Sequence, residues 1–187
     1  GVKVYQLTDQ HSPAMYGIDG VDRCSDDVPM AVLRMMLQAN CGGEWLFVDP
    51  DIIVRQDVRS VFDSPFDVAL TDRAGTSMAG TPYAAVMPYN LGVAFSRSPA
   101  FWRQATRRVQ KMSLSLQEWE GDQIAICQMV KQRAAGDVKI LPGRVYNYPP
   151  NSPNDDVSHA AIVHYKGGRK GWMAQIGKQT DGKVDKR

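Results

Sequence analysis

The sequence predicts an α/β fold built on a mainly parallel sheet flanked by helices. Short apolar runs typical of strands alternate along the chain with segments of helical periodicity, and no internal repeat or linker interrupts them. With 187 residues, 43% of them hydrophobic and 22% charged, the chain is long enough to bury a sizeable core. We therefore expect one domain over residues 1–177, followed by a polar, flexible tail at 178–187.

The N-terminal part predicts a strand, an irregular connection and a helix. Residues 2–7 alternate as a strand does, whereas residues 10–27 are rich in Gly, Pro, Asp and Ser. Asp26 and Asp27 can accept hydrogen bonds from the free amides of a helix start, and Pro29 suits the first turn. A helix is therefore expected directly after the irregular connection.

The helix is followed by an apolar strand that ends at an acidic pair. Apolar side chains recur at three- and four-residue steps until Gly42-Gly43, where the helix is expected to end. Residues 45–48 form a continuous apolar run typical of a buried parallel strand, and this run stops at Asp49-Pro50-Asp51. An apolar triplet at 52–54 follows, and then a short helix capped by Asp57 is expected. The later elements are expected as strands at 67–70, 92–95, 138–141 and 160–163, helices at 99–112 and 122–133, and loops at 75–89 and 146–156, the first of these loops at the active site.

Asp49 and Asp51 carry the most chemical information in the sequence. They lie one residue apart at the carboxyl end of an apolar strand, where ligand sites of α/β sheets gather. Two close carboxylates raise each other's pKa, so both stay charged only beside a cation or strong hydrogen bonds. Mg²⁺ and Mn²⁺ are hard divalent ions that prefer such oxygen ligands. The alternative is an ordinary Asp-Pro-Asp turn after a strand.

The segment 33–62 resembles the type-A nucleotide-sugar glycosyltransferases. Those enzymes carry a DxD motif after an apolar strand, with an arginine-bearing helix and often Gly-Gly ahead of it and a short helix ending in Phe behind it. Here Arg34, Gly42-Gly43, Asp49-Pro50-Asp51 and residues 57–62 occupy those places. The resemblance implies the Rossmann-like type-A fold, with Arg34 and Asp49 in contact with a nucleotide-sugar donor.

Residues 164–172 read HYKGGRKGW and resemble the HxxGxxKxW motif of the glycogenin and lipopolysaccharide galactosyltransferase family. The resemblance implies that His164 is the third metal ligand beside the two aspartates, and that Gly167 and Lys170 hold the donor diphosphate. An imidazole in a carboxylate site favours Mn²⁺ over Mg²⁺, a glycine permits close backbone approach, and a lysine supplies positive charge. The alternatives are a structural histidine and a solvated basic loop.

Weaker matches lie between these two motifs. An Asn-x-Gly at Asn90 and Gly92 resembles the family's strand start, which faces the sugar pocket, and an Asp-Gln at Asp122 and Gln123 resembles its helix start, where both side chains touch the transferred sugar. Asp72, after the strand at 67–70, is a further donor-site candidate. A turn explains the asparagine equally well, and helix capping explains Asp122.

The resemblance implies a metal-dependent hexosyltransferase. It would move a hexose from a nucleotide-diphosphate sugar, with a UDP-sugar expected, to a hydroxyl acceptor, with retention at the anomeric carbon and with no residue assigned as catalytic base. The acceptor stays open between a saccharide, a protein and a modified nucleic acid, and a homo-oligomer stays open as well. Family members usually have a first strand and helix ahead of the segment matching residues 2–9, and we expect this chain to lack them.

Two other functions stay open. A degenerate, non-catalytic nucleotide-sugar-binding module would keep the same motifs. A metal-dependent nucleotidyltransferase would also use paired acids and a lysine, but it would normally show a Gly- and basic-rich phosphate loop, which residues 2–20 do not contain. Trp102, Trp119 and residues 148–153 are open between an acceptor site and packing. Five basic residues could form a DNA-binding face, but we expect a solvated helix face instead; they are Arg97, Arg103, Arg107, Arg108 and Lys111.

Charge and cysteine content indicate a cytoplasmic protein. The net charge of +2 is too small to indicate binding to nucleic acid or to a membrane surface. Cys24, Cys41 and Cys127 are few, odd in number and not paired as CxxC, so we expect free thiols. The sequence shows no secretory leader and no apolar run long enough to span a bilayer.

Overall fold

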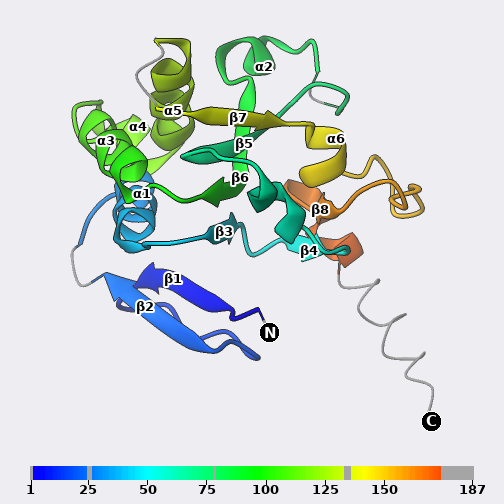
Figure 1. The fold of residues 1–187 in the computed structure, drawn as a ribbon, viewed down its shortest axis with the longest axis horizontal. Helices are drawn as coiled ribbons and strands as arrows, with labels where there is room; N and C mark the ends of the chain where they lie inside the picture. The colour runs from blue at the N-terminus through cyan, green and yellow to red at the C-terminus, as the bar shows by residue number, and fades with distance from the viewer. Residues whose placement is uncertain (1, 25–26, 78, 133–135, 174–187) are drawn as a thin grey trace. The chain divides into compact units, whose positions relative to one another are not determined.

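The computed structural model describes residues 2–24, 27–77, 79–132 and 136–173, and Figure 1 labels their helices and strands. The chain divides into two compact units, each assembled from separate stretches of sequence. The first unit comprises Gly1–Trp45, Phe66–Val68 and Ser96–Val138, and the second comprises Leu46–Pro65, Ala69–Phe95 and Lys139–Arg187. The expected tail at 178–187 lies outside the described residues, as does Asp26, and the single domain over 1–177 stays a prediction.

The first unit begins with two parallel strands, β1 (Tyr5–Asp9) and β2 (Gly20–Cys24). β1 starts and ends later than the predicted strand at 2–7. β2 lies inside the connection predicted to be irregular, so that prediction was wrong there. The strand was missed because it has no apolar alternation and is held by backbone pairing with β1, in which Tyr5 faces Gly20. Arg23 strengthens this part of the unit by donating to the carbonyl of Asp9 at 2.8 Å.

Helix α1 (Met30–Asn40) packs against both strands and against three further helices of the first unit. Its N-cap is Pro29, and no side chain caps it, so the predicted capping role of Asp27 was wrong. Its buried face centres on Met35 and includes Leu33 and Leu37, whereas Met30 is exposed. The three helices that α1 contacts are α3 (Pro99–Val109), α4 (Leu114–Glu118) and α5 (Gly121–Lys131), of which α4 was not predicted.

Trp102 of α3 lies at the centre of the first unit's helical layer. Its side chain is 0% exposed, and its indole Nε1 donates to Ser96 Oγ at 2.7 Å. α3 starts where the sequence predicts, with Ser98 as N-cap accepting from the amide of Phe101 and Pro99 in the first turn. Of the two readings left open for Trp102, the structure therefore supports packing.

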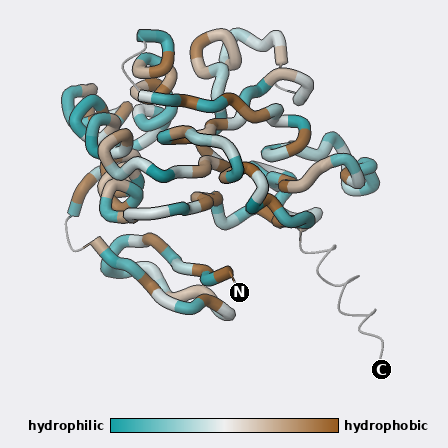
Figure 2. The backbone as a smooth tube through the Cα atoms, viewed as in Figure 1, coloured by the Kyte–Doolittle hydropathy of each residue, from teal (hydrophilic) through white to brown (hydrophobic). Residues whose placement is uncertain are grey.

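A four-stranded sheet runs in the order β3 (Trp45–Val48), β6 (Tyr89–Ser96), β5 (Val68–Asp72) and β7 (Val138–Leu141). Hydrophobic residues mark these strands as brown stretches in Figure 2. β6 has a neighbour on each side and is buried from Leu91 to Ser96. β3 lies at an edge, and its Val48 is 45% exposed, so the prediction of a fully buried strand at 45–48 was wrong.

The α/β class is confirmed, but the strands are mixed in direction and not mainly parallel. Arg73 N donates to Pro88 O at 2.9 Å, and Thr71 Oγ1 donates to Asn90 O at 2.9 Å, so β5 and β6 run antiparallel. A parallel neighbour would need a long crossover, usually a helix. The connection from residue 73 to 88 carries the short helix α2 (Pro82–Val86) instead, within a stretch predicted to be a loop.

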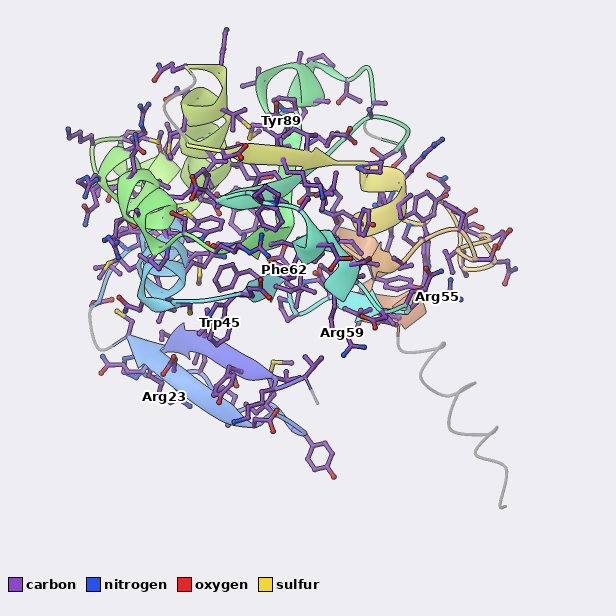
Figure 3. All side chains as sticks on the ribbon, viewed as in Figure 1. Arg23, Trp45, Arg55, Arg59, Phe62 and Tyr89 are labelled. Atoms are coloured by element: carbon purple, nitrogen blue, oxygen red, sulfur yellow. The ribbon has the colours of Figure 1, made fainter. Side chains whose placement is uncertain are left out.

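A second antiparallel pair joins β4 (Ile52–Val54) to β8 (Ile162–His164), with Ile52 opposite His164. The 3-10 helix η1 (Arg59–Asp63) follows β4. Its N-cap is Val58, so the predicted capping role of Asp57 was wrong, although Asp57 Oδ1 accepts from the amide of Arg59 at 3.0 Å. The Phe62 ring of η1, labelled in Figure 3, packs edge-on against the Phe95 ring, with the ring centroids 5.6 Å apart. The remaining elements are α6 (Gly143–Tyr146) and the 3-10 helix η2 (Gly167–Arg169).

The cysteines are free thiols, as predicted. Cys24 is half-buried, and Cys41 and Cys127 are buried. Burial, aided by the charge of Asp22, raises the pKa of Cys41 to about 11, so its thiol is unreactive at neutral pH. Across the described part of the chain, no helix has the length and apolarity that crossing a membrane requires.

Substituting Trp102 by alanine is expected to destabilise the protein by about 3–5 kcal/mol, because it removes a fully buried indole and leaves a cavity. Urea denaturation followed by circular dichroism measures the loss. Trp119→Ala is the matched control: its side chain is 72% exposed, so the change should stay within about 0.5 kcal/mol. Equal effects of the two substitutions would contradict the packing role of Trp102.

Candidate metal and donor site

The second unit brings three ligand-type side chains together at the ends of its strands. Asp49 follows β3, Asp51 precedes β4, and His164 ends β8. One ligand atom from each lies within 4.8 Å of the others, and this group can hold a metal ion. His164 Nε2 is 3.1 Å from Asp51 Oδ1 and 3.7 Å from Asp49 Oδ2. The side chains of His164, Asp51 and Asp49 are 3%, 12% and 30% exposed, so the group opens to solvent on the side of Asp49.

Backbone hydrogen bonds fix the positions of these ligands. Tyr165 N donates to Asp51 O at 2.8 Å and so extends the β4–β8 pairing past its end. Asp49 N donates to Gly92 O at 2.9 Å, which ties the acidic turn to the central strand β6. The Asp-Pro-Asp segment is thus a turn, as the alternative reading held, and it is a turn whose carboxylates converge on an imidazole.

Gly92 is required by the close approach of the ligands. A Cβ atom at this position would lie 2.7 Å from His164 Nδ1 and 3.0 Å from Asp49 Oδ2. Real side chains do not tolerate the first contact, so any other residue would push the imidazole or the carboxylate away. Gly92 thus leaves room for two metal-ligand candidates, and its predicted contact with the donor stays a prediction.

Asn147 orients the imidazole, and sequence reasoning missed it. Thr71 Oγ1 donates to the carbonyl of Asn90, so it must accept from Asn147 Nδ2, which lies 2.7 Å away. Asn147 Oδ1 therefore faces His164 Nδ1 at 2.8 Å and accepts a hydrogen bond from it. The imidazole then carries its proton on Nδ1 and directs the Nε2 lone pair at the carboxylates.

The charges and donor atoms of this group suit a bound cation. Burial lowers the pKa of His164, and the charges of Asp49 and Asp51 only partly oppose that effect. A neutral imidazole that turns its lone pair toward two carboxylates is unfavourable unless a cation lies between them. Two carboxylate oxygens and one imidazole nitrogen form a donor set that suits Mn²⁺, and Mg²⁺ less well.

The glycine and lysine of the C-terminal motif lie beside this group. Lys170 Nζ is 3.5 Å from Asp51 Oδ2, and its side chain is mostly exposed. Gly167 has φ +65°, a left-handed conformation that favours glycine, and it is exposed with open space where a Cβ would be. The backbone at Gly167 is therefore open to a ligand from solvent.

Lys166 is a further basic residue of the C-terminal motif, and no role was predicted for it. Burial lowers its pKa to about 8, with the charges of Arg73 and Arg169 contributing next, while Asp49 and Asp51 oppose the shift. The ammonium group of Lys166 therefore lies within electrostatic range of the candidate metal ligands. With Arg169 and Lys170, it is one of three basic residues in the motif.

Trp172, at the end of the motif, has a packing role. It packs against a hydrophobic cluster that contains Tyr148, Ala160, Val163 and Tyr165. Tyr148 also donates its hydroxyl proton to Asp155 Oδ2 at 2.8 Å, so the loop at 148–153, left open as an acceptor site, begins with a packed residue.

Arg34, Asp122 and Gln123, the predicted sugar contacts from two distant segments, meet in the first unit. Arg34 Nη1 lies 3.3 Å from Asp122 Oδ2, and Asp122 is buried. Asp122 Oδ1 accepts from the amide of Gln123 at 2.7 Å. The N-cap of α5 is Glu120, which adopts a left-handed φ of 69°, so Asp122 is not the capping residue. Whether these side chains contact a sugar stays a prediction.

Asn90 and Asp72 make structural contacts in the second unit. Asn90 Oδ1 accepts from the amide of Gly92 at 2.9 Å, which is the turn interaction of the alternative reading. Asp72 Oδ1 accepts from the amide of Gly143, the first residue of α6, at 2.9 Å. Their predicted contacts with the donor remain untested predictions.

The basic residues on and around α3 are divided between paired and exposed positions. Arg97 Nη2 lies 2.6 Å from Glu44 Oε1, and Arg108 Nη1 donates to Gln132 Oε1 at 2.9 Å. Arg103, Arg107 and Lys111 are exposed, and Arg103 Nη1 also donates to Ala39 O at 3.5 Å. These contacts agree with the predicted solvated helix face.

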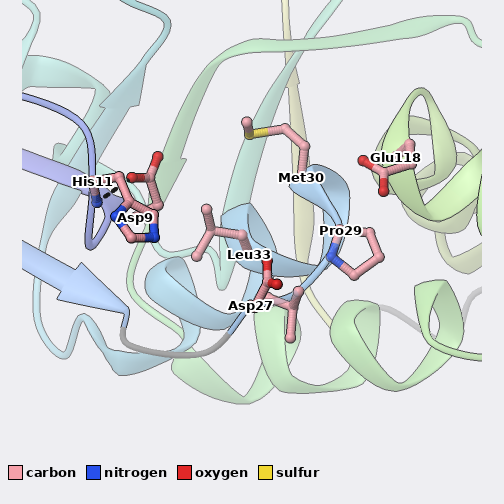
Figure 4. Close-up of a pocket in the computed structure, with 8 residues that line it drawn as sticks. Asp9, His11, Asp27, Pro29, Met30, Leu33 and Glu118 are labelled. Carbon is pink, nitrogen blue, oxygen red and sulfur yellow. Dashed lines mark hydrogen bonds between the residues drawn. The ribbon is translucent and has the colours of Figure 1, made fainter.

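A cavity of about 480 Å³ lies in the first unit, at the start of α1 (Figure 4), and the sequence did not reveal it. Ser12 Oγ donates to Asp9 Oδ2 at 2.7 Å, and Asp9 Oδ1 accepts from the amides of Ser12 and His11; these bonds, the Ser12 hydroxyl first, lower the pKa of Asp9 to about 2. That carboxylate therefore shapes the loop after β1. The lining residues are Asp9, His11, Asp27, Val28, Pro29, Met30, Leu33 and Glu118.

Neither a family model nor a curated protein matches the chain. Among solved structures, the chain is similar to the crystal structure of a glycosyltransferase involved in the glycosylation of the major capsid of PBCV-1. The TM-score is 0.63 at 12% sequence identity, and the match covers 94% of this chain and 100% of that chain. At this identity the likeness shows the fold, which is that of a solved glycosyltransferase. The narrower resemblance to the glycogenin and lipopolysaccharide galactosyltransferase family stays a prediction.

Gly92→Ala is expected to weaken Mn²⁺ binding at least about tenfold, because the added methyl group would displace His164 or Asp49 from the ligand group. Titration with Mn²⁺, following the electron paramagnetic resonance signal of the free ion, measures the affinity. Gly42→Ala is the control, since nothing lies within 4 Å of its Cβ position and its φ is not left-handed. Wild-type affinity in Gly92→Ala would show that the metal binds elsewhere.

Asn147→Leu is expected to lower Mn²⁺ affinity about 10- to 100-fold, because the imidazole loses the acceptor that fixes its tautomer. Asn147→Asp keeps an acceptor opposite His164 Nδ1 and should retain most of the affinity. The same Mn²⁺ titration compares both variants, and thermal melting checks that each is folded. Equal losses in the two variants would contradict an orienting role for residue 147.

Proposed function

We propose that this protein is a divalent-metal-dependent glycosyltransferase that transfers a hexose from a nucleotide-diphosphate sugar to a hydroxyl acceptor. The observation that carries the proposal is the group of Asp49, Asp51 and His164, with the imidazole lone pair directed at the carboxylates, on the fold of a solved glycosyltransferase. The C-terminal motif that contains His164 favours a UDP-sugar and retention at the anomeric carbon, and we extend the proposal to both.

The residues proposed to bind the metal ion and those proposed to bind the diphosphate have separate roles. Asp49, Asp51 and His164 hold Mn²⁺ or Mg²⁺, which when bound neutralises the charge that develops on the leaving diphosphate. Lys170, whose side chain is mostly exposed, adds a positive charge, and the exposed backbone at Gly167 allows phosphate oxygens to approach. Both features support binding of a diphosphate at the metal group.

We assign the transferred sugar to Arg34, Asp122 and Gln123, with Asn90 as a further orienting residue. The ion pair between Arg34 and Asp122 holds a guanidinium and a carboxylate in fixed positions, as hydroxyl recognition requires. Asp72 and Gly92 stay proposed donor contacts: Asp72 Oδ1 is held by the amide of Gly143, and Gly92 leaves open space beside His164 and Asp49. The free, buried thiols of Cys41 and Cys127 fit a reducing compartment such as the cytoplasm, and we extend the proposal to it.

A panel of nucleotide-sugars tests the function. With Mn²⁺, the wild type should release nucleoside diphosphate from one donor, and chelation should abolish the release. Asp51→Asn should lower the rate at least about 100-fold, because it removes one of two metal-binding carboxylates. Asp63→Asn, at the end of η1, is the control acidic variant and should keep the rate.

Two results would argue against the proposal in different ways. Mn²⁺-dependent nucleotide binding without sugar release from any donor would indicate a degenerate binding module. Release that persists at full rate in Asp51→Asn would place the chemistry outside the candidate site.

A further inference from the structure

Asp51 has a different neighbour at each of its two carboxylate oxygens. His164 Nε2 lies 3.1 Å from Oδ1, and Lys170 Nζ lies 3.5 Å from Oδ2. The Asp51 side chain is 12% exposed, and that of Lys170 is 63% exposed. Since Asp51 also belongs to the candidate metal group, a cation held there and the ammonium group of Lys170 compete for the same carboxylate.

The contact between Lys170 and Asp51 is a weak ion pair. At 3.5 Å, this N–O distance is longer than that of an ordinary N–H···O hydrogen bond, about 2.7–3.2 Å. A mostly exposed ammonium group also gains little from one carboxylate, because water competes for it. Lys139 of the same unit differs, since its Nζ donates to Ser64 Oγ at 2.7 Å. The pair between Lys170 and Asp51 therefore breaks at little cost in free energy.

The chain on either side of Lys170 is held in place, while the lysine side chain can turn. Arg169 donates from Nε to Pro150 O at 2.6 Å, and Trp172 packs against the hydrophobic cluster that contains Tyr148. A lysine carries its charge at the end of a flexible four-carbon stem. The ammonium group of Lys170 can therefore exchange Asp51 for another partner close by without a change in the main chain.

A divalent cation changes which partner suits Lys170. Once Asp49 and Asp51 share such a cation, their negative charge is neutralised, and the ammonium group of Lys170 is no longer attracted to them. The oxygens of a diphosphate carry negative charge, and charge-assisted hydrogen bonds from an ammonium group to phosphate are short and strong. A diphosphate at the metal group is then the better partner for Lys170.

We infer that Lys170 exchanges partners when the donor binds: it gives up Asp51 to the divalent cation and pairs with the donor's diphosphate instead. The inference rests on the proposed function, since it concerns the cation and the donor of the same site. It differs from a fixed contact with the diphosphate, because Lys170 then opposes binding of the cation alone and favours binding of the cation and the diphosphate together.

Binding titrations separate the two roles of Lys170. Lys170→Met should raise Mn²⁺ affinity without nucleotide about two- to fivefold, because it removes a weak ion pair that competes for Asp51. The same substitution should lower UDP affinity at saturating Mn²⁺ at least about tenfold, as expected for the loss of a charge-assisted hydrogen bond. Lys139→Met is the matched control and should change neither affinity by more than about twofold, since its ammonium group is bound to Ser64 Oγ.

A crystal structure of the wild type with Mn²⁺ and UDP tests the exchange directly and needs no variant. Lys170 Nζ should lie within hydrogen-bond distance of a diphosphate oxygen and more than about 4 Å from Asp51 Oδ2. A lysine that still pairs with Asp51 in that complex would overturn the inference.

The outcomes separate this inference from the proposed function. Lower Mn²⁺ affinity in Lys170→Met would show that the lysine orients Asp51 for the cation, and it would overturn the inference while the proposed function stands. Equal UDP affinity in wild type and Lys170→Met would overturn it as well. The expected opposite changes in the two affinities, without sugar release from any donor, would instead leave the inference standing and remove the proposed function. A wild type that binds Mn²⁺ but neither UDP, GDP, ADP nor pyrophosphate would refute both.

Discussion

The antiparallel pairing of β4 with β8 is the constraint on which the candidate site depends. It sets Ile52 opposite His164, and the following bond from Tyr165 N to Asp51 O carries the pairing into the acidic turn. Two segments that are far apart in the sequence are thereby aligned by main-chain bonds, which do not depend on side-chain identity. The side chains then add chemistry to a backbone geometry that is already fixed, as precise metal sites require.

A buried polar network completes what the strand pairing begins. Thr71, Asn90, Asn147 and His164 form a chain of hydrogen bonds in which each donor faces an acceptor. Such networks are costly when one member is unsatisfied and rigid when all are satisfied. The Asn90 carbonyl can only accept a hydrogen bond, and this fixes which atom donates in each following bond as far as the imidazole. The tautomer of the His164 imidazole is thus fixed by a carbonyl on β6, the strand next to β3, through Thr71 on β5.

The convergence of Asp49, Asp51 and His164 was predictable because its signals are local: an acidic pair ending an apolar run, and a histidine opening a motif with glycine and lysine. Asn147 could not be found in this way, because an asparagine in a loop carries no sign of the imidazole that it will meet. Strand direction was missed for a similar reason, since the apolar pattern of β6 is the same for parallel and antiparallel neighbours. The α/β class and the elements α3, α5 and β7 were predictable from periodicity and capping, whereas β2 is specified by its partner strand.

Gly92 makes the register of the sheet and the chemistry of the site inseparable. A slip of β6 by two residues keeps the same side chains facing the core but would put Asn90 or Ala94 beside His164. Either residue carries a Cβ in the space that the ligands need, so a misregistered chain would fold its core and still be unable to bind a cation. If the candidate site is loaded with an ion, its binding would report on correct strand pairing.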